Sequence, residues 1–133
     1  MFYAWDITIP AGQSESSPVT EILKLTEGLI RSIDVKYPAG CHGLVKVKLM
    51  RWDWQLVPLN RDSWLTGDDE TVATETKYLI DDVPTELKFL GCAPSAKYDH
   101  VVSVRINLER EDVNPVKTLS DQLTSLFRRL GLM

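Results

Sequence analysis

The chain has 133 residues, of which 44% are hydrophobic and 26% charged, and its net charge is −4 at pH 7. This length suits one domain that buries roughly two-thirds of the surface exposed by its unfolded chain. The composition argues against a disordered protein. The acidic balance disfavours nucleic acid as a partner, because nucleic-acid binding requires a basic face.

The sequence shows no transmembrane segment and no export signal. No apolar run is long enough to cross a bilayer, and the first ten residues, MFYAWDITIP, lack the basic start and long apolar core of a signal peptide. We therefore expect a cytoplasmic product, or one that is assembled in the cytoplasm. Its two cysteines, Cys41 and Cys92, lie beside glycines. We interpret them as reduced residues packed near strand ends, with a disulfide between them as the alternative.

Residues 1 to 9 predict a strand, because apolar side chains recur at every second position from Tyr3 to Ile9. Phe2 and Trp5 then point to opposite faces, so both faces of this end of the strand can be covered. The favoured interpretation is a first strand folded on its own domain. The alternative is an N-terminal arm that packs on a neighbouring subunit.

Residues 10 to 18 form a polar loop of small residues, and two further strands follow it, over 19–25 and 29–37. The three residues between these strands, Thr26 to Gly28, suit a tight turn that contains glycine. The sequence therefore predicts that the two strands form a hairpin.

Residues 44 to 51 alternate cleanly, with Val45, Val47 and Leu49 on one face and lysines on the other, as in a half-buried strand. Strand-like segments flank this one on both sides in sequence, so we expect it to be a central strand of a β-sandwich. A segment over 52–59 follows, which Pro58 either ends or places at the edge of a sheet. Residues 60–70 then form a long polar loop.

Three more strands are predicted over 71–80, 86–90 and 100–110. The last is the most regular, with Val102, Val104, Ile106 and Leu108 inward. Residues 1–110 therefore form one all-β domain of about eight strands, and short loops favour antiparallel pairing. The pattern fits an antiparallel β-sandwich or a jelly roll.

Residues 111–133 read as a linker followed by a C-terminal amphipathic helix. Apolar side chains recur at helical spacing, and Thr118 and Gly131 suit the two ends of the helix. A helix of about twelve residues is marginal alone in water, so its apolar stripe must dock on something. Docking on its own sandwich and docking on a neighbouring copy or another protein both stay open. The stripe consists of Leu119, Leu123, Leu126, Phe127 and Leu130.

The sequence carries no catalytic motif. It lacks a nucleophile elbow, a phosphate-binding glycine loop and a zinc-protease helix. Cys41, His42, Cys92 and His100 match no zinc spacing. Asp68, Asp69 and Glu70 form an acidic turn without the spaced ligands of a calcium loop. We therefore expect no enzyme, no metal and no cofactor.

Three tryptophans gather in one stretch of the sequence, Trp52, Trp54 and Trp64. Trp52 and Trp54 are two residues apart, so we expect them on one strand face, buried or exposed together. We rank a core role first, an interface role second and stacking on sugar rings third. Tryptophan beside arginine is typical of interface hot spots.

Four segments carry a resemblance to a known class of proteins: FYAWDITIPAG, LKLTEGLIRSIDVKYPAGCHGLVKVKL, RWDWQLVPLN and HVVSVRINL. Together they resemble small accessory virion proteins of tailed phages and environmental viruses, of the β-sandwich decoration or cement type. The resemblance covers residues 1 to about 110, and the C-terminal helix departs from it.

This resemblance implies a non-enzymatic structural subunit located in the virion. Its partners would be further copies of itself or a capsid lattice, with no nucleic acid and no membrane. The alternative is a module that binds carbohydrate or another ligand through Trp52, Trp54 and Trp64. The expected contact residues of the structural subunit are Phe2, Trp5, Trp52, Trp54, Trp64, Leu119, Leu123, Leu126, Phe127 and Leu130.

Overall fold

The computed structural model describes residues 1–110, Leu123 and Gly131. Residues 1–110 form two antiparallel sheets. The predicted C-terminal helix and the linker before it lie outside the described residues, apart from Leu123 and Gly131. The strands are β1 (Phe2–Ile9), β2 (Val19–Lys24), β3 (Gly28–Tyr37), β4 (Lys46–Arg51), β5 (Trp54–Val57), β6 (Leu65–Thr66), β7 (Glu70–Ile80), β8 (Glu86–Cys92) and β9 (His100–Glu109).

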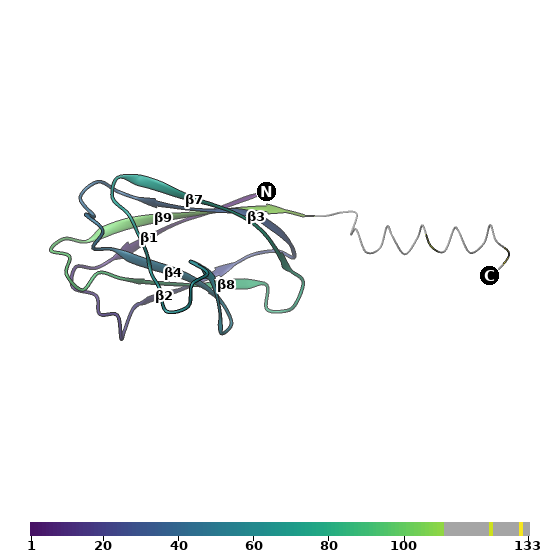
Figure 1. Cartoon of the computed structure of the whole chain (residues 1–133), viewed down its shortest axis with the longest axis horizontal. Coiled ribbons are helices and arrows are strands. Elements are labelled where there is room, and N and C mark those ends of the chain that lie inside the picture. Colours follow the sequence, from purple (N-terminus) through teal and green to yellow (C-terminus); the bar gives the residue numbers. More distant parts are fainter. Residues whose placement is uncertain (111–122, 124–130, 132–133) are drawn as a thin grey trace.

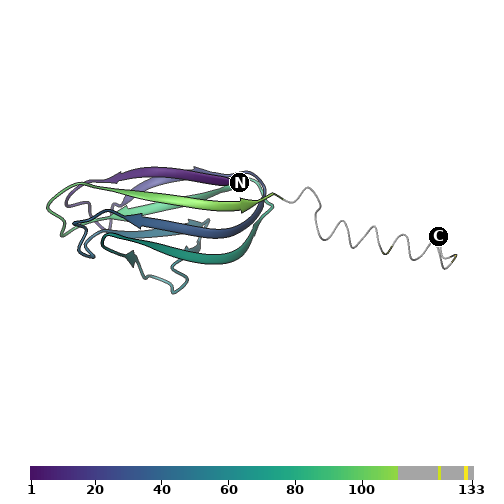
Figure 2. The same ribbon diagram turned by 90° about the horizontal axis from the view of Figure 1, so that it is seen from above.

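The two sheets face each other as the layers of a β-sandwich (Figures 1 and 2). One sheet has the order β1-β9-β3-β7, and the other has the order β2-β8-β4-β5, with the short β6 also pairing with β4. Every connection from β1 to β4 and from β7 to β9 crosses from one sheet to the other. The turn from β4 to β5, by contrast, stays within one sheet.

The core lies between the sheets and consists of the inward side chains of alternating strands. The predicted faces are confirmed: Val45, Val47 and Leu49 are fully buried, and so are the four predicted residues of β9. β4 is also a central strand, as predicted, because it lies between β8 and the pair β5 and β6. Burial of this kind stabilises a fold by roughly 1.5–3 kcal/mol for each large apolar side chain.

The predicted hairpin between residues 19–25 and 29–37 is wrong. β2 pairs with β8, whereas β3 pairs with β7 and β9 in the other sheet. The short connection crosses between the layers, and the amide of Leu25 donates to the carbonyl of Thr85 (2.9 Å). Gly28 allows the backbone of β3 to approach that of β9 closely at this point. A Cβ at this position would lie 2.8 Å from the carbonyl oxygen of Glu109.

The first strand belongs to its own domain, as favoured, because β1 pairs with β9 along its whole length. Two differences from the sequence prediction concern short pieces of strand. β6 is a two-residue strand inside the predicted polar loop, and β8 extends two residues past Leu90 to Cys92. With β6, residues 1–110 contain nine strands rather than about eight.

The connections gather at two ends of the sandwich. At one end the β1–β2 loop contacts the β8–β9 loop, where the amide of Ala11 donates to Asp99 Oδ1 (2.8 Å) and that of Gly12 to the carbonyl of Ala93 (3.0 Å). The β4–β5 turn, the β7–β8 turn and both ends of the described domain lie at the other end. In the described part of the chain, no helix is long and apolar enough to span a bilayer.

Cys41 and Cys92 are free thiols, and both are fully buried. Burial raises the pKa of each thiol, and the negative charges of Asp68 near Cys41 and Glu15 near Cys92 raise it further. The thiolate is the reactive form of cysteine, so both features protect these residues.

We predict that neither cysteine reacts quickly with Ellman's reagent in the folded protein. In denaturant without reductant, both thiols should react, since burial and the raised pKa are lost together. The measurement is the thiol count over time under each condition. Fewer than two reactive thiols in the unfolded chain would indicate a disulfide and contradict the structure.

Candidate functional site

The structure places the predicted contact residues in different surroundings. Phe2 on β1 is 73% exposed, whereas Trp5 is half-buried and its ring stacks on that of Tyr3. Trp52 and Trp54 are 56% and 58% exposed. The core role ranked first for these two tryptophans is therefore wrong.

The four residues 51–54, here called the tryptophan turn, explain that exposure. Arg51 ends β4 and Trp54 begins β5, so Trp52 and Asp53 form a two-residue turn. Trp52 has a φ of 54°, in the left-handed region that is uncommon for residues other than glycine. The turn breaks the alternation of the strand. Trp52 and Trp54 are therefore both exposed, as the sequence allowed, but they do not share one strand face.

Arg51 links the tryptophan turn to the β7–β8 turn through the hydrogen bonds of its buried side chain. Its side chain is only 2% exposed, and its guanidinium donates to the carbonyls of Asp82 (2.9 Å), Glu86 (3.0 Å) and Pro84 in and beside the β7–β8 turn. A buried charge is tolerated only when its hydrogen bonds are made. Among the described residues, no carboxylate pairs with this guanidinium, so backbone carbonyls supply its partners.

The ring of Trp52 covers the same guanidinium, with 4.1 Å between Arg51 Cζ and the ring centroid. One face of the indole therefore contacts the arginine, and the side chain as a whole stays 56% exposed. Val83, in the β7–β8 turn that Arg51 holds, is 90% exposed. Exposed apolar side chains of both turns therefore lie around a guanidinium whose position is set by its hydrogen bonds.

Trp64 is placed apart from the tryptophan turn. It is half-buried, and Lys48 Nζ lies 4.2 Å from its ring centroid. The loop that carries Trp64 is organised by Gln55. The side-chain amide of Gln55 contacts the carbonyls of Pro58 (2.7 Å), Ser63 (2.9 Å) and Asn60 (3.1 Å). No pattern in the sequence predicted that this glutamine would be buried.

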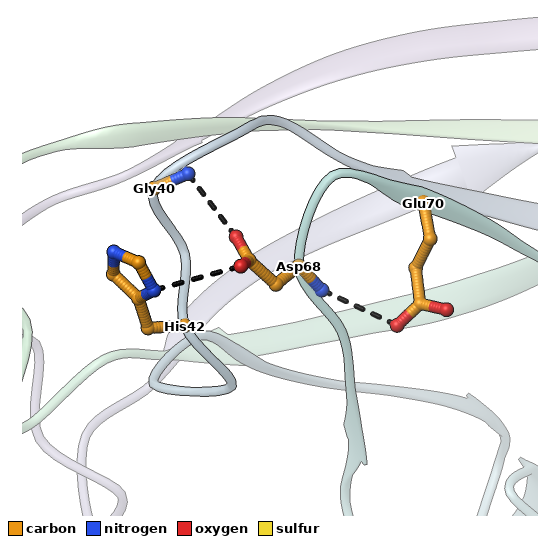
Figure 3. Close-up of polar contacts among 4 residues, drawn as sticks. All are labelled: Gly40, His42, Asp68 and Glu70. Atoms are coloured by element: carbon orange, nitrogen blue, oxygen red, sulfur yellow. Dashed lines mark hydrogen bonds and ion pairs between the residues drawn. The ribbon is translucent and has the colours of Figure 1, made fainter.

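The acidic turn considered for calcium has a different set of partners (Figure 3). Asp68 accepts from the amide of Gly40 (3.1 Å), and its other oxygen lies 3.5 Å from His42 Nδ1. The amide of Asp68 in turn donates to Glu70 Oε1 (3.3 Å). These contacts tie the β3–β4 loop to the β6–β7 loop. In the part of the chain that the structure describes, no three His, Cys, Asp or Glu side chains form a metal-binding group.

The same contacts lower the pKa of Asp68. The largest cause is the hydrogen bond from the backbone amide of His42, and the His42 side chain and the amides of Gly40 and Cys41 add to it. Two backbone hydrogen bonds also join the β3–β4 loop to the β6–β7 loop. The amide of Asp69 donates to the carbonyl of Pro38 (3.3 Å), and the amide of Gly43 donates to the carbonyl of Gly67 (3.3 Å). We interpret this cluster as a structural crossing of two loops.

No protein-family model matches the chain, and no curated protein matches it either. The candidate site therefore rests on the geometry of the tryptophan turn and on the exposure of its side chains.

We predict that Arg51→Met lowers the free energy of unfolding by about 3 kcal/mol, because three backbone carbonyls lose their charged donor. Urea denaturation measures the change. Lys48→Met, on the same strand but over Trp64, is the matched control and should cost less than about 1 kcal/mol. Equal losses in the two variants would contradict the role given to Arg51.

We also predict that Asp68→Asn lowers the melting temperature at neutral pH. Because the folded-state pKa of Asp68 lies below its ordinary value, its contribution is complete above that ordinary value and is lost as the pH falls through the folded pKa. The difference from wild type should therefore close in acid. Asp69→Asn, at the exposed neighbouring position, is the control. A difference that persists unchanged in acid would contradict this assignment.

Proposed function

We propose that this protein is a structural subunit that acts through protein–protein contacts, as an accessory component of a virus particle, without catalysis. The tryptophan turn carries the proposal. Tryptophan and arginine dominate the residues that supply most of the energy in interfaces. Here the two are stacked on each other beside a second exposed tryptophan and the exposed Val83.

The fold supports the same proposal at a finer level. The orders β1-β9-β3-β7 and β2-β8-β4-β5, with connections that cross between the layers, are those of a jelly roll. Double-sheet jelly rolls occur in viral capsid proteins and in lectins. This agrees with the resemblance of residues 1–110 to virion accessory proteins, in which the partners would be further copies or a capsid lattice.

The rigidity of the tryptophan turn favours an interface over a flexible surface loop. Ordering side chains on binding costs about 0.5–1.5 kcal/mol for each immobilised side chain. The guanidinium of Arg51 is already held by three carbonyls and covered by Trp52. A partner that binds this surface therefore loses little conformational entropy in ordering Arg51 and Trp52.

A carbohydrate-binding module is the second candidate, and the exposure of Trp52 and Trp54 is the observation that favours it. Sugar rings stack on the faces of exposed aromatic rings, and some jelly rolls are lectins. Against it, one face of Trp52 is already covered by Arg51, and Trp64 is half-buried under Lys48. The three tryptophans thus do not form one open platform.

The test is the solution mass of the full-length chain by light scattering, across a range of concentrations. We expect a defined oligomer that dissociates in the double variant Trp52→Ala, Trp54→Ala, because truncation of a hot-spot residue costs about 2 kcal/mol or more, roughly a thirtyfold loss of affinity. Tyr98→Ala is the matched control, since Tyr98 is also strongly exposed but lies in the β8–β9 loop at the other end of the sandwich.

A chain that ends at Asp112 separates the contribution of the C-terminal segment from that of the tryptophans. If the double variant keeps the wild-type mass, the tryptophan turn is not the contact. If the full-length chain is a monomer at every concentration, self-association is wrong. A shift of tryptophan fluorescence on addition of sugars, lost in the double variant, would support the carbohydrate module in its place.

A further inference from the structure

The two lateral openings of the sandwich, where the edges of the sheets approach each other, differ in how they are filled. On the β1–β2 side, the rings of Tyr3 and Trp5 stack with centroids 5.7 Å apart and an angle of 7°. The Tyr3 hydroxyl donates to Thr26 Oγ1 (3.2 Å) and accepts from the Thr26 amide (3.2 Å). Aromatic side chains therefore close this opening.

The opposite side, between β5 and β7, holds an apolar groove of about 250 Å³, here called the lateral groove. Apolar side chains line it from one sheet, and the middle of β7 lines it from the other. Leu59 is 70% exposed beside it. The lining residues are Leu56, Val57, Pro58, Leu59, Leu65, Thr74, Glu75 and Thr76.

We propose that the lateral groove is the docking site of the C-terminal segment of the same molecule, with Phe127 and its apolar neighbours as anchors. The groove is smaller than the roughly 300–1,000 Å³ of typical small-molecule sites, and it suits one or two side chains of a docked helix. This inference is independent of the assembly role proposed for the tryptophan turn.

The C-terminal sequence supplies a complementary occupant. Leu123, the one residue of its apolar stripe that the structure describes, is 46% exposed, so the stripe still needs a partner surface. Residues 119–130 carry an apolar stripe at helical spacing, which must be covered for a helix of this length to form. Phe127 is followed directly by Arg128 and Arg129. The lateral groove offers apolar walls that match the stripe. Glu75 is also among its lining residues and is exposed on β7 between the half-buried Thr74 and Thr76, so it supplies a negative charge at the outer side of the groove that matches Arg128 and Arg129.

The place where the described domain ends makes the groove reachable. Glu109, Leu29 and Leu79 are in register across β9, β3 and β7. β7 is thus two strands, about 10 Å, from β9, and Thr76 lies three residues, about 10 Å, further along β7. The seven residues 111–117 can span up to about 25 Å when extended. A tethered segment within reach also has the advantage of a high effective concentration over one from a second molecule.

Paramagnetic relaxation in the full-length chain tests the proposal. A nitroxide is attached at Ser125→Cys, which is off the predicted apolar stripe, and the buried Cys41 and Cys92 stay unlabelled. We expect the amide signals of Val57, Leu59 and Thr76 to broaden to the same extent at every dilution. Adding Phe127→Asp should abolish the broadening, whereas Thr124→Asp, off the stripe, should preserve it.

A second sample distinguishes docking within one molecule from docking between molecules. Spin-labelled chains without isotope are mixed with isotope-labelled chains without the nitroxide. Both chains of this mixture carry Trp52→Ala and Trp54→Ala, so that association through the tryptophan turn does not bring a label near the groove of a neighbour. The proposal then expects no broadening. Broadening there would show that the segment docks on a neighbour and overturn the proposal, as would unchanged amide signals around the groove in the first sample.

A charge variant gives an independent measurement. Glu75→Lys should weaken the broadening, since it places a cation opposite Arg128 and Arg129. Glu21→Lys, an exposed position on β2 at the far edge of the other sheet, is the matched control and should leave it unchanged. Equal broadening in the two variants would overturn the charge complementarity on which the choice of occupant depends.

Discussion

The whole molecule depends on one constraint, the alternation of buried and exposed side chains along strands that face each other across a single core. β9 shows it most clearly, since Val102, Val104, Ile106 and Leu108 are all fully buried while β1 and β3 pair on either side of the strand. A chain of this size can bury enough apolar surface to fold without cross-links. Cys41 and Cys92 accordingly stay free thiols. The turns at both ends of the sandwich contribute little to the core, so their residues can serve other functions.

Arg51 connects this core to the surface. It occupies an inward position at the end of β4, where an apolar residue would continue the pattern, and its charge is buried at a cost that three carbonyls of the neighbouring turn offset. The same side chain supports the ring of Trp52, whose backbone adopts a left-handed conformation. Unusual backbone geometry maintained by well-satisfied neighbours is often found at functional sites. This is why we propose the turn, rather than the regular strands, as the interaction surface.

The sequence predicted the strands and their buried faces well, because a period of two depends only on local side-chain chemistry. The sequence-based prediction failed where the structure depends on contacts between segments that are far apart in the sequence. The connection from Leu25 to Gly28 is short enough for a hairpin. It crosses between the sheets because β2 pairs with β8 in one sheet and β3 pairs with β9 in the other. The exposure of Trp52 likewise depends on the turn geometry and on carbonyls some thirty residues away in the sequence.

β5 brings the two candidate surfaces close together. It begins at Trp54 in the tryptophan turn and ends at Val57 in the wall of the lateral groove, about 10 Å further along the strand. A segment docked in the groove would therefore lie next to the exposed tryptophans and extend their apolar surface. A partner that covers Trp52 and Trp54 would then also meet the docked segment. Interfaces place their strongest contacts within surroundings that exclude water, and a filled groove would provide such surroundings on one side of the tryptophan turn.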